Sequence, residues 1–226
     1  GTIRLTQQAD NFTGENAGAD GSDTTFVAPV TQNETGSGAL ANTFETGDVL
    51  DGGADSTNEL RADLIATGTI QDGFLGSQGV AISAETTNVQ NVFLRAQAVQ
   101  NDGGASNTTA AATIDAQNME GVEQWWTDNS RANISIEDIR SATQDTTFGM
   151  RETDPGVSYQ AFFNPLFLEG DTSSDSELSL VIQEIDGDEV LAANQLENIT
   201  VRLGFIIRGL RLRGIYDSTM PEFEKL

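Results

Sequence analysis

The stretch Phe44-Glu-Thr-Gly-Asp-Val-Leu-Asp-Gly-Gly-Ala-Asp-Ser-Thr-Asn-Glu-Leu-Arg-Ala-Asp-Leu64 joins a glycine pair to many oxygen-bearing side chains. Because Gly52 and Gly53 let the backbone bend tightly, its carbonyl groups can point inward beside carboxylates. A hard cation such as Ca²⁺ requires about six to eight oxygen ligands of this kind. The sequence therefore predicts a bound calcium ion, with candidate ligands Asp48, Asp51, Asp55, Asn58 and Asp63.

A second group of acidic residues precedes this stretch. Asp20 and Asp23 lie in loops rich in glycine and threonine. Two interpretations stay open for them. Either they ligate a cation as well, or they are simply solvated, which is more frequent for loop carboxylates.

Short β-prone segments recur further along the chain and are separated by turns of Gly, Asn, Asp and Gln. Their spacing of roughly 20 to 30 residues is typical of a stacked coil or of a β-sandwich. We therefore expect an all-β fold, either a stacked β-solenoid or a β-sandwich, with long Gly/Asp/Asn loops. The expected strands are 60–67, 80–83, 89–98, 110–116, 122–127, 134–139 and 146–152.

The character of the chain changes at Asp154-Pro155-Gly156, which predicts a turn. We expect a Thr/Asn/Gly-rich β domain over residues 1–153 and a C-terminal antiparallel β region over 154–226. The second region ends in an arginine-rich strand. Either its arginines dock a neighbouring copy head to tail, or they pair with acids of the same chain. They are Arg202, Arg208, Arg211 and Arg213.

Two adjacent tryptophans stand in the middle of the chain. On a strand Trp125 and Trp126 point to opposite faces, so one of them is expected in the core. Trp126 is the candidate for an exposed platform that contacts a sugar or a neighbouring subunit. The alternative is that loops cover both rings, since large aromatic side chains are mostly buried.

Several segments carry a resemblance to a known class of proteins. They are Leu5-Thr6, Asp10-Asn11-Phe12-Thr13-Gly14, Asp23-Thr24-Thr25-Phe26-Val27-Ala28, Gly47-Asp48-Val49-Leu50-Asp51-Gly52-Gly53 and Glu85-Thr86-Thr87-Asn88-Val89. In this order they resemble bacterial surface-layer and RTX-adhesin-like secreted proteins. The calcium nonapeptide of that family is matched only in part, because its third glycine is missing and no tandem copy follows. The resemblance implies calcium binding and self-assembly outside the cell.

Composition narrows the possible partners and sites. The 226 residues include 35 acidic and 11 basic residues, and the formal net charge is -24. Such a field repels nucleic acid and anionic membrane surfaces. No apolar run of about 18 residues occurs, so we expect no membrane insertion. The absence of cysteine and histidine removes disulfides, the common zinc sites and nucleophilic sites built on these residues.

Three functions compete on these observations. The first is a non-catalytic, calcium-stabilised structural or adhesion protein of an extracellular surface layer, which assembles with copies of itself. The second is a virion structural protein, such as a capsid decoration or a tail fibre. The third is a carbohydrate-active enzyme, for which a pair of carboxylates is a weak signal among so many acids. We expect the first, with no enzymatic activity and a location at the cell surface.

Overall fold

The computed structural model describes residues 1–70, 77–78, 80–98, 107–140, 146–153, 157–164 and 179–183. Strands dominate these ranges, and one short 3₁₀ helix, η1 (Gly14–Asn16), interrupts them. None of the helical structure in this part of the chain has the length and apolar character that a membrane crossing requires. The strands are β1 (Thr2–Arg4), β2 (Asn11–Phe12), β3 (Thr25–Ala28), β4 (Thr31–Gln32), β5 (Leu40–Ala41), β6 (Val49–Asp51), β7 (Glu59–Ala66), β8 (Gly68–Ile70), β9 (Ser77–Gln78), β10 (Ile82–Ser83), β11 (Glu85–Thr87), β12 (Asn91–Ala98), β13 (Asn107–Asp115), β14 (Gln124–Asp128), β15 (Ala132–Ile139), β16 (Thr147–Arg151), β17 (Tyr159–Phe163) and β18 (Ser179–Gln183).

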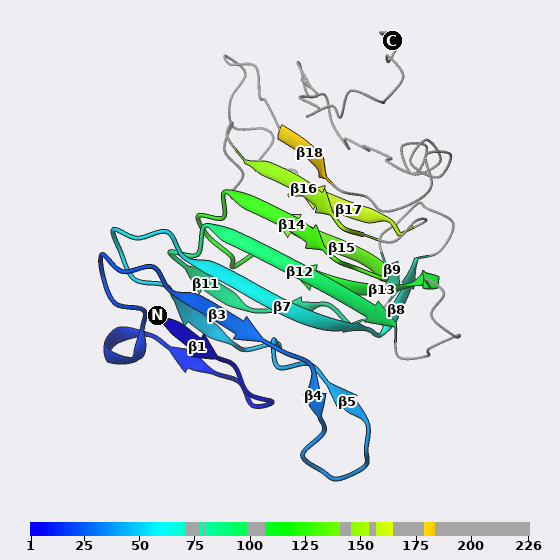
Figure 1. Ribbon diagram of the computed structural model, residues 1–226, viewed down its shortest axis with the longest axis horizontal. Helices are drawn as coiled ribbons and strands as arrows, with labels where there is room; N and C mark the ends of the chain where they lie inside the picture. Colours follow the sequence, from blue (N-terminus) through cyan, green and yellow to red (C-terminus); the bar gives the residue numbers. More distant parts are fainter. Residues whose placement is uncertain are drawn as a thin grey trace, which may run out of the picture.

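Within the described ranges, seven strands form a parallel sheet that we call the front sheet, in the order β1-β3-β7-β12-β14-β16-β18 (Figure 1). Each strand pairs in register with the strand of the next coil. Glu59 pairs with Thr25 on one side and with Asn91 on the other, and Asn91 pairs with Gln124. One coil therefore takes 32 to 34 residues in this part of the sheet. The next step is shorter, because Gln124 pairs with Thr147.

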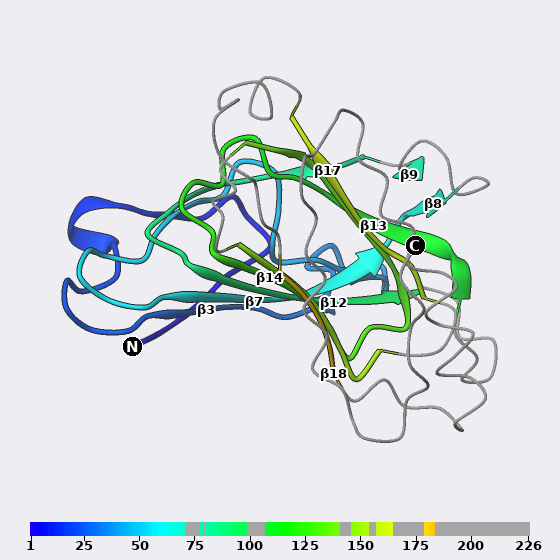
Figure 2. The ribbon, with the colours of Figure 1, turned by 90° about the horizontal axis from the view of Figure 1, so that it is seen from above.

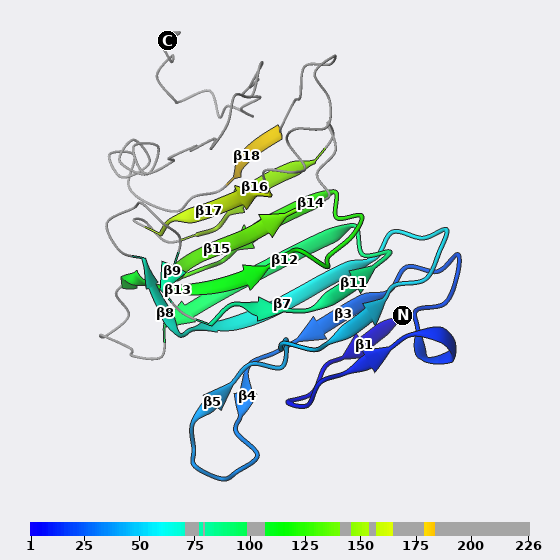
Figure 3. The same ribbon diagram turned by 180° about the vertical axis from the view of Figure 1, so that it is seen from behind.

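Two further sheets complete the coils. The back sheet, seen from its own side in Figure 3, has the order β17-β15-β13-β8-β9, with β10 also paired to β13. The side sheet has the order β11-β6-β2 and is parallel throughout. From β6 to β13 the chain passes twice from the side sheet to the front sheet and then to the back sheet. From β14 to β18 the described strands alternate between the front sheet and the back sheet. Seen from above, successive coils lie over one another (Figure 2).

The core lies between these sheets and follows from the alternation of side chains. In β7, Leu60, Ala62 and Leu64 point inward and are almost fully buried, while Arg61 and Asp63 point outward. Each fully buried large apolar side chain contributes about 1.5–3 kcal/mol. The inward positions of neighbouring strands lie in register, so one row of the core consists of Phe26, Leu60, Val92, Trp125 and Phe148.

The predicted strand positions are confirmed for the segments near residues 60–66, 91–98 and 134–139. The predicted fold class is wrong. We expected a β-solenoid or β-sandwich with an antiparallel C-terminal region, but the sheets are mostly parallel. Beyond residue 153, β17 pairs parallel with β15, and β18 pairs parallel with β16.

The parallel pairing follows from the way in which neighbouring strands are connected. Antiparallel neighbours are joined by short hairpins, whereas parallel neighbours need a long crossover. Here the chain leaves each strand for another sheet and returns one coil later in the same direction. Antiparallel pairing is confined in the described ranges to β4 with β5 and to β8 with β9 and β13. The two-domain division at residue 153 stays a prediction.

Candidate functional site

The predicted calcium ligands lie mostly in the turns that lead from the side sheet to the front sheet. Asp48 is fully buried. Its two carboxylate oxygens accept hydrogen bonds from the backbone N–H groups of Asp10 and Glu45, each at 2.8 Å. Asp48 thus joins two turns of the chain by hydrogen bonds, and both of its oxygens are used in doing so.

Three other predicted ligands bind backbone N–H groups in the same way. In each case the donor lies in residues 53–57, so these carboxylates hold the glycine bend in place. Asp51 accepts a hydrogen bond from Gly53 at 3.0 Å, Asp20 from Ala54 at 2.9 Å and Asp23 from Thr57 at 3.0 Å. Asp51 also accepts one from the side-chain amide of Asn88 at 2.9 Å.

Asn58 is fully buried and connects three coils. Its side-chain oxygen accepts a hydrogen bond from the backbone N–H of Thr24 at 2.8 Å. Its side-chain nitrogen donates to the backbone oxygens of Gly53 at 3.0 Å and Asn88 at 2.7 Å. The side-chain oxygen is the atom through which an asparagine binds a cation. Here it already accepts hydrogen bonds from the Thr24 N–H and from the Ser56 hydroxyl at 3.2 Å.

The glycines of the bend serve close packing between coils. A Cβ atom on Gly52 would lie 2.3 Å from the carbonyl oxygen of Asn88, and one on Gly18 would lie 2.0 Å from the carbonyl oxygen of Gly52. Gly53 also has a positive φ of 87°, which favours glycine. Because these glycines have no Cβ atom, three consecutive turns can stack directly on one another.

The remaining two predicted ligands lie apart from this stack. Asp55 is exposed at the tip of the bend, with a φ of 57°. Asp63 lies on the outer face of the front sheet and forms an ion pair with Arg95 at 2.8 Å. In the ranges that the structure describes, no group of three or more acidic side chains is placed to hold a metal ion. The residues do not fit a calcium cage there, and calcium binding stays a prediction.

Burial makes the Asp48 side chain an unusually weak acid. Loss of solvent contact, and to a smaller degree the charges of Asp10 and Glu45, raise the pKa of Asp48 to about 6 from its ordinary value of 3.8, although its hydrogen bonds oppose the shift. Between these two pH values the folded chain holds a proton that the unfolded chain has lost. The free energy of unfolding should therefore fall as the pH rises from about 4 to about 6.

Replacing Asp48 with Asn should remove this pH dependence, because the variant has no proton to bind at that position. We expect the difference in unfolding free energy between wild type and Asp48→Asn to change by up to about 3 kcal/mol between pH 4 and pH 7. Urea denaturation at a series of pH values measures this difference. A difference that stays constant over the whole pH range would contradict the assignment.

The outer face of the front sheet carries a cluster of aromatic and charged side chains. Trp126 stacks on Phe93, with ring centroids 6.3 Å apart and an interplanar angle of 18°. The guanidinium of Arg61 lies 4.5 Å from the centroid of the Phe93 ring, and that of Arg151 lies 5.6 Å from both rings. The Trp126 ring packs against Gly149 of the next strand, where a Cβ atom would lie 2.2 Å from it.

These contacts settle the positions of the two tryptophans. Trp125 is in the core and Trp126 is on the outer face, as expected for neighbours on a strand. Trp126 is nevertheless only 7% exposed. It is therefore not an exposed platform for a sugar or a subunit. The four candidate interface arginines, Arg202, Arg208, Arg211 and Arg213, lie outside the described residues.

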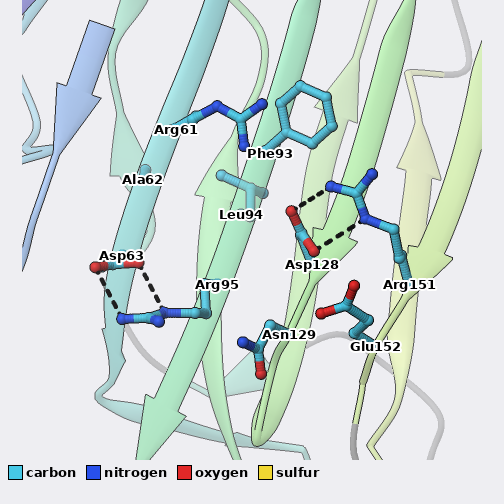
Figure 4. A pocket seen from close by; sticks show the side chains of 10 residues that line it. All are labelled: Arg61, Ala62, Asp63, Phe93, Leu94, Arg95, Asp128, Asn129, Arg151 and Glu152. Carbon is cyan, nitrogen blue, oxygen red and sulfur yellow. Dashed lines mark hydrogen bonds and ion pairs between the residues drawn. The ribbon is translucent and has the colours of Figure 1, made fainter. Parts of the chain in front are cut away.

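Next to this aromatic cluster lies a depression of about 340 Å³, which we call the front-sheet pocket (Figure 4). Two ion pairs border it. Asp63 binds Arg95 with distances of 2.8 and 3.0 Å, and Asp128 binds Arg151 with distances of 3.1 and 2.6 Å. Its other polar lining residues are Arg61, Asn129 and Glu152.

Of the residues that line the front-sheet pocket, the sequence pattern predicts a binding role only for Asp63, as a calcium ligand. Its residues come from four strands or their ends, and they meet only because the coils stack in register. A signal was present in the sequence. Arg61, Phe93 and Trp126 all occupy outward positions of strands, and those positions follow one another at the length of one coil.

Chemically, the face offers planar charged groups beside an aromatic edge. Each of its paired carboxylates is held by an arginine, so neither is an isolated acid or base. No protein-family model, curated protein or solved structure matches the chain.

Proposed function

We propose that the chain is a non-catalytic structural module that assembles with copies of itself at the surface of a bacterial cell, in a surface layer or an adhesin. The observation that carries the proposal is the in-register stack of parallel strands. Each coil adds one rung to the same sheets, and buried residues such as Asn58 and Asp48 bind the turns of neighbouring coils to one another. Such an arrangement makes an elongated, self-supporting scaffold.

A role without catalysis is supported by the state of the carboxylates on the front sheet. Asp63 and Asp128 are both engaged in ion pairs with arginines. A glycosidase needs one carboxyl group that keeps its proton and a second that acts as a base or nucleophile. Because each of these two carboxylates is held by a guanidinium, neither is free to serve as the acid or the base of such a pair.

Assembly with copies of the same chain is supported by the distribution of charge. The chain carries a formal net charge of -24, and four of its 11 basic residues fall between Arg202 and Arg213. An acidic surface on one copy and a basic segment on the next attract one another and fix the orientation of the contact. This contact is heterologous, so it can repeat indefinitely and build a layer or filament.

The test is the oligomeric state of the purified chain with and without calcium. We expect higher-order species in light scattering, and sheets or tubes in electron micrographs, when Ca²⁺ is present. If the predicted calcium binding holds, EDTA should dissolve them and lower the thermal midpoint, because an ion at a hundredfold excess over its dissociation constant stabilises the fold by about 2.7 kcal/mol. An unchanged melt in EDTA would contradict calcium binding, and a monodisperse monomer under all conditions would contradict the proposal.

A charge reversal tests the contact itself. The double variant Arg211→Glu with Arg213→Glu should melt like wild type but remain monomeric. The matched control changes two other arginines by the same charge, in Arg4→Glu with Arg140→Glu, and should assemble normally. Loss of assembly in both variants would point to net charge alone and would remove the basic segment from the proposal.

A further inference from the structure

The front-sheet pocket holds an equal number of cationic and anionic side chains. Three arginines and three carboxylates line it, namely Arg61, Arg95, Arg151, Asp63, Asp128 and Glu152. We propose that this pocket binds a neutral saccharide. The inference does not depend on the proposed assembly function, because a monomer has the complete pocket.

The balance of charge argues for a neutral ligand. An anion that contacts the arginines is repelled by the carboxylates beside them. A cation that contacts the carboxylates is repelled by the arginines. The chain as a whole carries a large negative charge, so the equal charges of this pocket are a local feature. A ligand with hydroxyl groups suits both kinds of lining residue, because each hydroxyl donates one hydrogen bond and accepts others.

The ion pairs hold these groups in fixed positions. Arg95 is bound to Asp63 and Arg151 to Asp128, each pair through two nitrogen–oxygen contacts (Figure 4). A bidentate pair between guanidinium and carboxylate is planar and geometrically specific. Donors and acceptors that are already positioned lose little conformational entropy when a ligand binds.

Two further polar side chains of the pocket are unengaged within the described part of the chain. Asn129 and Glu152 follow the ends of β14 and β16 on neighbouring coils. Both have a left-handed backbone, with φ values of 54° and 48°. Such conformations are costly for residues other than glycine and often occur at binding sites. Neither side chain forms a hydrogen bond or ion pair with any described residue, so both are available to a ligand.

One aromatic side chain of the cluster, Phe93, gives the pocket an apolar element. Phe93 lines the pocket, and the guanidinium of Arg61 lies over its ring. Saccharides have apolar C–H groups between their hydroxyl groups, and the part of the Phe93 ring that Arg61 leaves uncovered can contact them. The volume of about 340 Å³ lies near the lower end of the range of ligand pockets, about 300–1,000 Å³. This suits a short segment of a sugar chain.

The test is isothermal titration calorimetry of the full chain with defined tetrasaccharides. The neutral probes are cellotetraose, maltotetraose, mannotetraose and tetra-N-acetylchitotetraose, and the charged probes are tetragalacturonate and the chitosan tetramer. We expect at least one neutral probe to bind with a dissociation constant of about 1 mM or tighter, and the charged probes to bind more weakly. No binding of any neutral probe, or tighter binding of a charged one, would overturn the inference.

Two variants locate the binding. Glu152→Gln and Asn129→Asp exchange near-isosteric groups on exposed turns, so both should melt close to wild type. Each should weaken the binding of the neutral probe about tenfold, since it changes one hydrogen-bonding group of the pocket. The matched control Glu120→Gln alters an exposed glutamate away from the pocket and should bind like wild type. If both pocket variants bind as wild type does, the saccharide site is not here.

Discussion

Replacing Asn58 with Asp should lower the free energy of unfolding by about 3–5 kcal/mol, and calcium should not restore it. The variant has no side-chain nitrogen to donate to the carbonyl oxygens of Gly53 and Asn88, which lie at 3.0 and 2.7 Å. A carboxylate oxygen would face these carbonyl oxygens in a position that is fully buried. Urea denaturation with Ca²⁺ and with EDTA measures the loss.

The same substitution separates the two interpretations of the glycine bend. If Asn58 is a calcium ligand, an aspartate adds charge to the ion and should make the fold more stable when calcium is present. The control is Asn16→Asp, which makes the same chemical change at an exposed asparagine at the end of η1. A calcium-dependent gain in Asn58→Asp, absent from the control, would show that the hydrogen-bond interpretation is wrong.

Replacing Gly52 with Ala should destabilise the fold by about 3 kcal/mol. The added Cβ atom would lie 2.3 Å from the carbonyl oxygen of Asn88 and 2.6 Å from the side-chain carbon Cγ of Asn58. Because one of the two clashing atoms belongs to the backbone of the next coil, the coils have to move apart. This movement strains the hydrogen bond from the Gly52 N–H to Thr87, which measures 3.0 Å.

The matched control for this prediction is Gly21→Ala. Gly21 has a positive φ of 70°, but no atom lies within 4 Å of an added Cβ. The cost that remains at Gly21 is that of holding alanine in a left-handed backbone conformation, about 1–2 kcal/mol. Chemical denaturation of both variants gives the comparison. If Gly52→Ala were no more destabilising than Gly21→Ala, the turns would not be in contact as the structure shows.

Parts of the scaffold could be predicted from local sequence alone. The alternation of Leu60, Ala62 and Leu64 with Arg61 and Asp63 fixes a half-buried strand without any knowledge of its neighbours, since side chains alternate between the faces of a strand. The adjacent Trp125 and Trp126 likewise had to point to opposite faces of their strand. These predictions succeeded because each depends on residues two positions apart or fewer.

The direction of strand pairing could not be predicted in this way. A strand with one buried face has the same alternation of buried and exposed residues in a parallel and in an antiparallel sheet. The alternation in residues 59–66 and 91–98 therefore does not distinguish the two kinds of sheet. The distinction depends on where the chain goes between the strands. That is decided by the packing of whole coils, which local patterns do not contain.

From the residues alone it follows that this chain forms short strands with alternate residues buried, that tight glycine bends join them, and that the chain carries a strong negative charge. The role of the bends and of their polar residues depends on contacts between coils. The partners of Asn58 at Thr24 and Asn88 are 30 or more residues away in the chain. Likewise, Arg151 reaches Asp128 only because β14 and β16 are neighbours. Oxygen atoms that suit a cation in an isolated loop become hydrogen-bond acceptors once stacking brings backbone N–H groups from adjacent turns within reach.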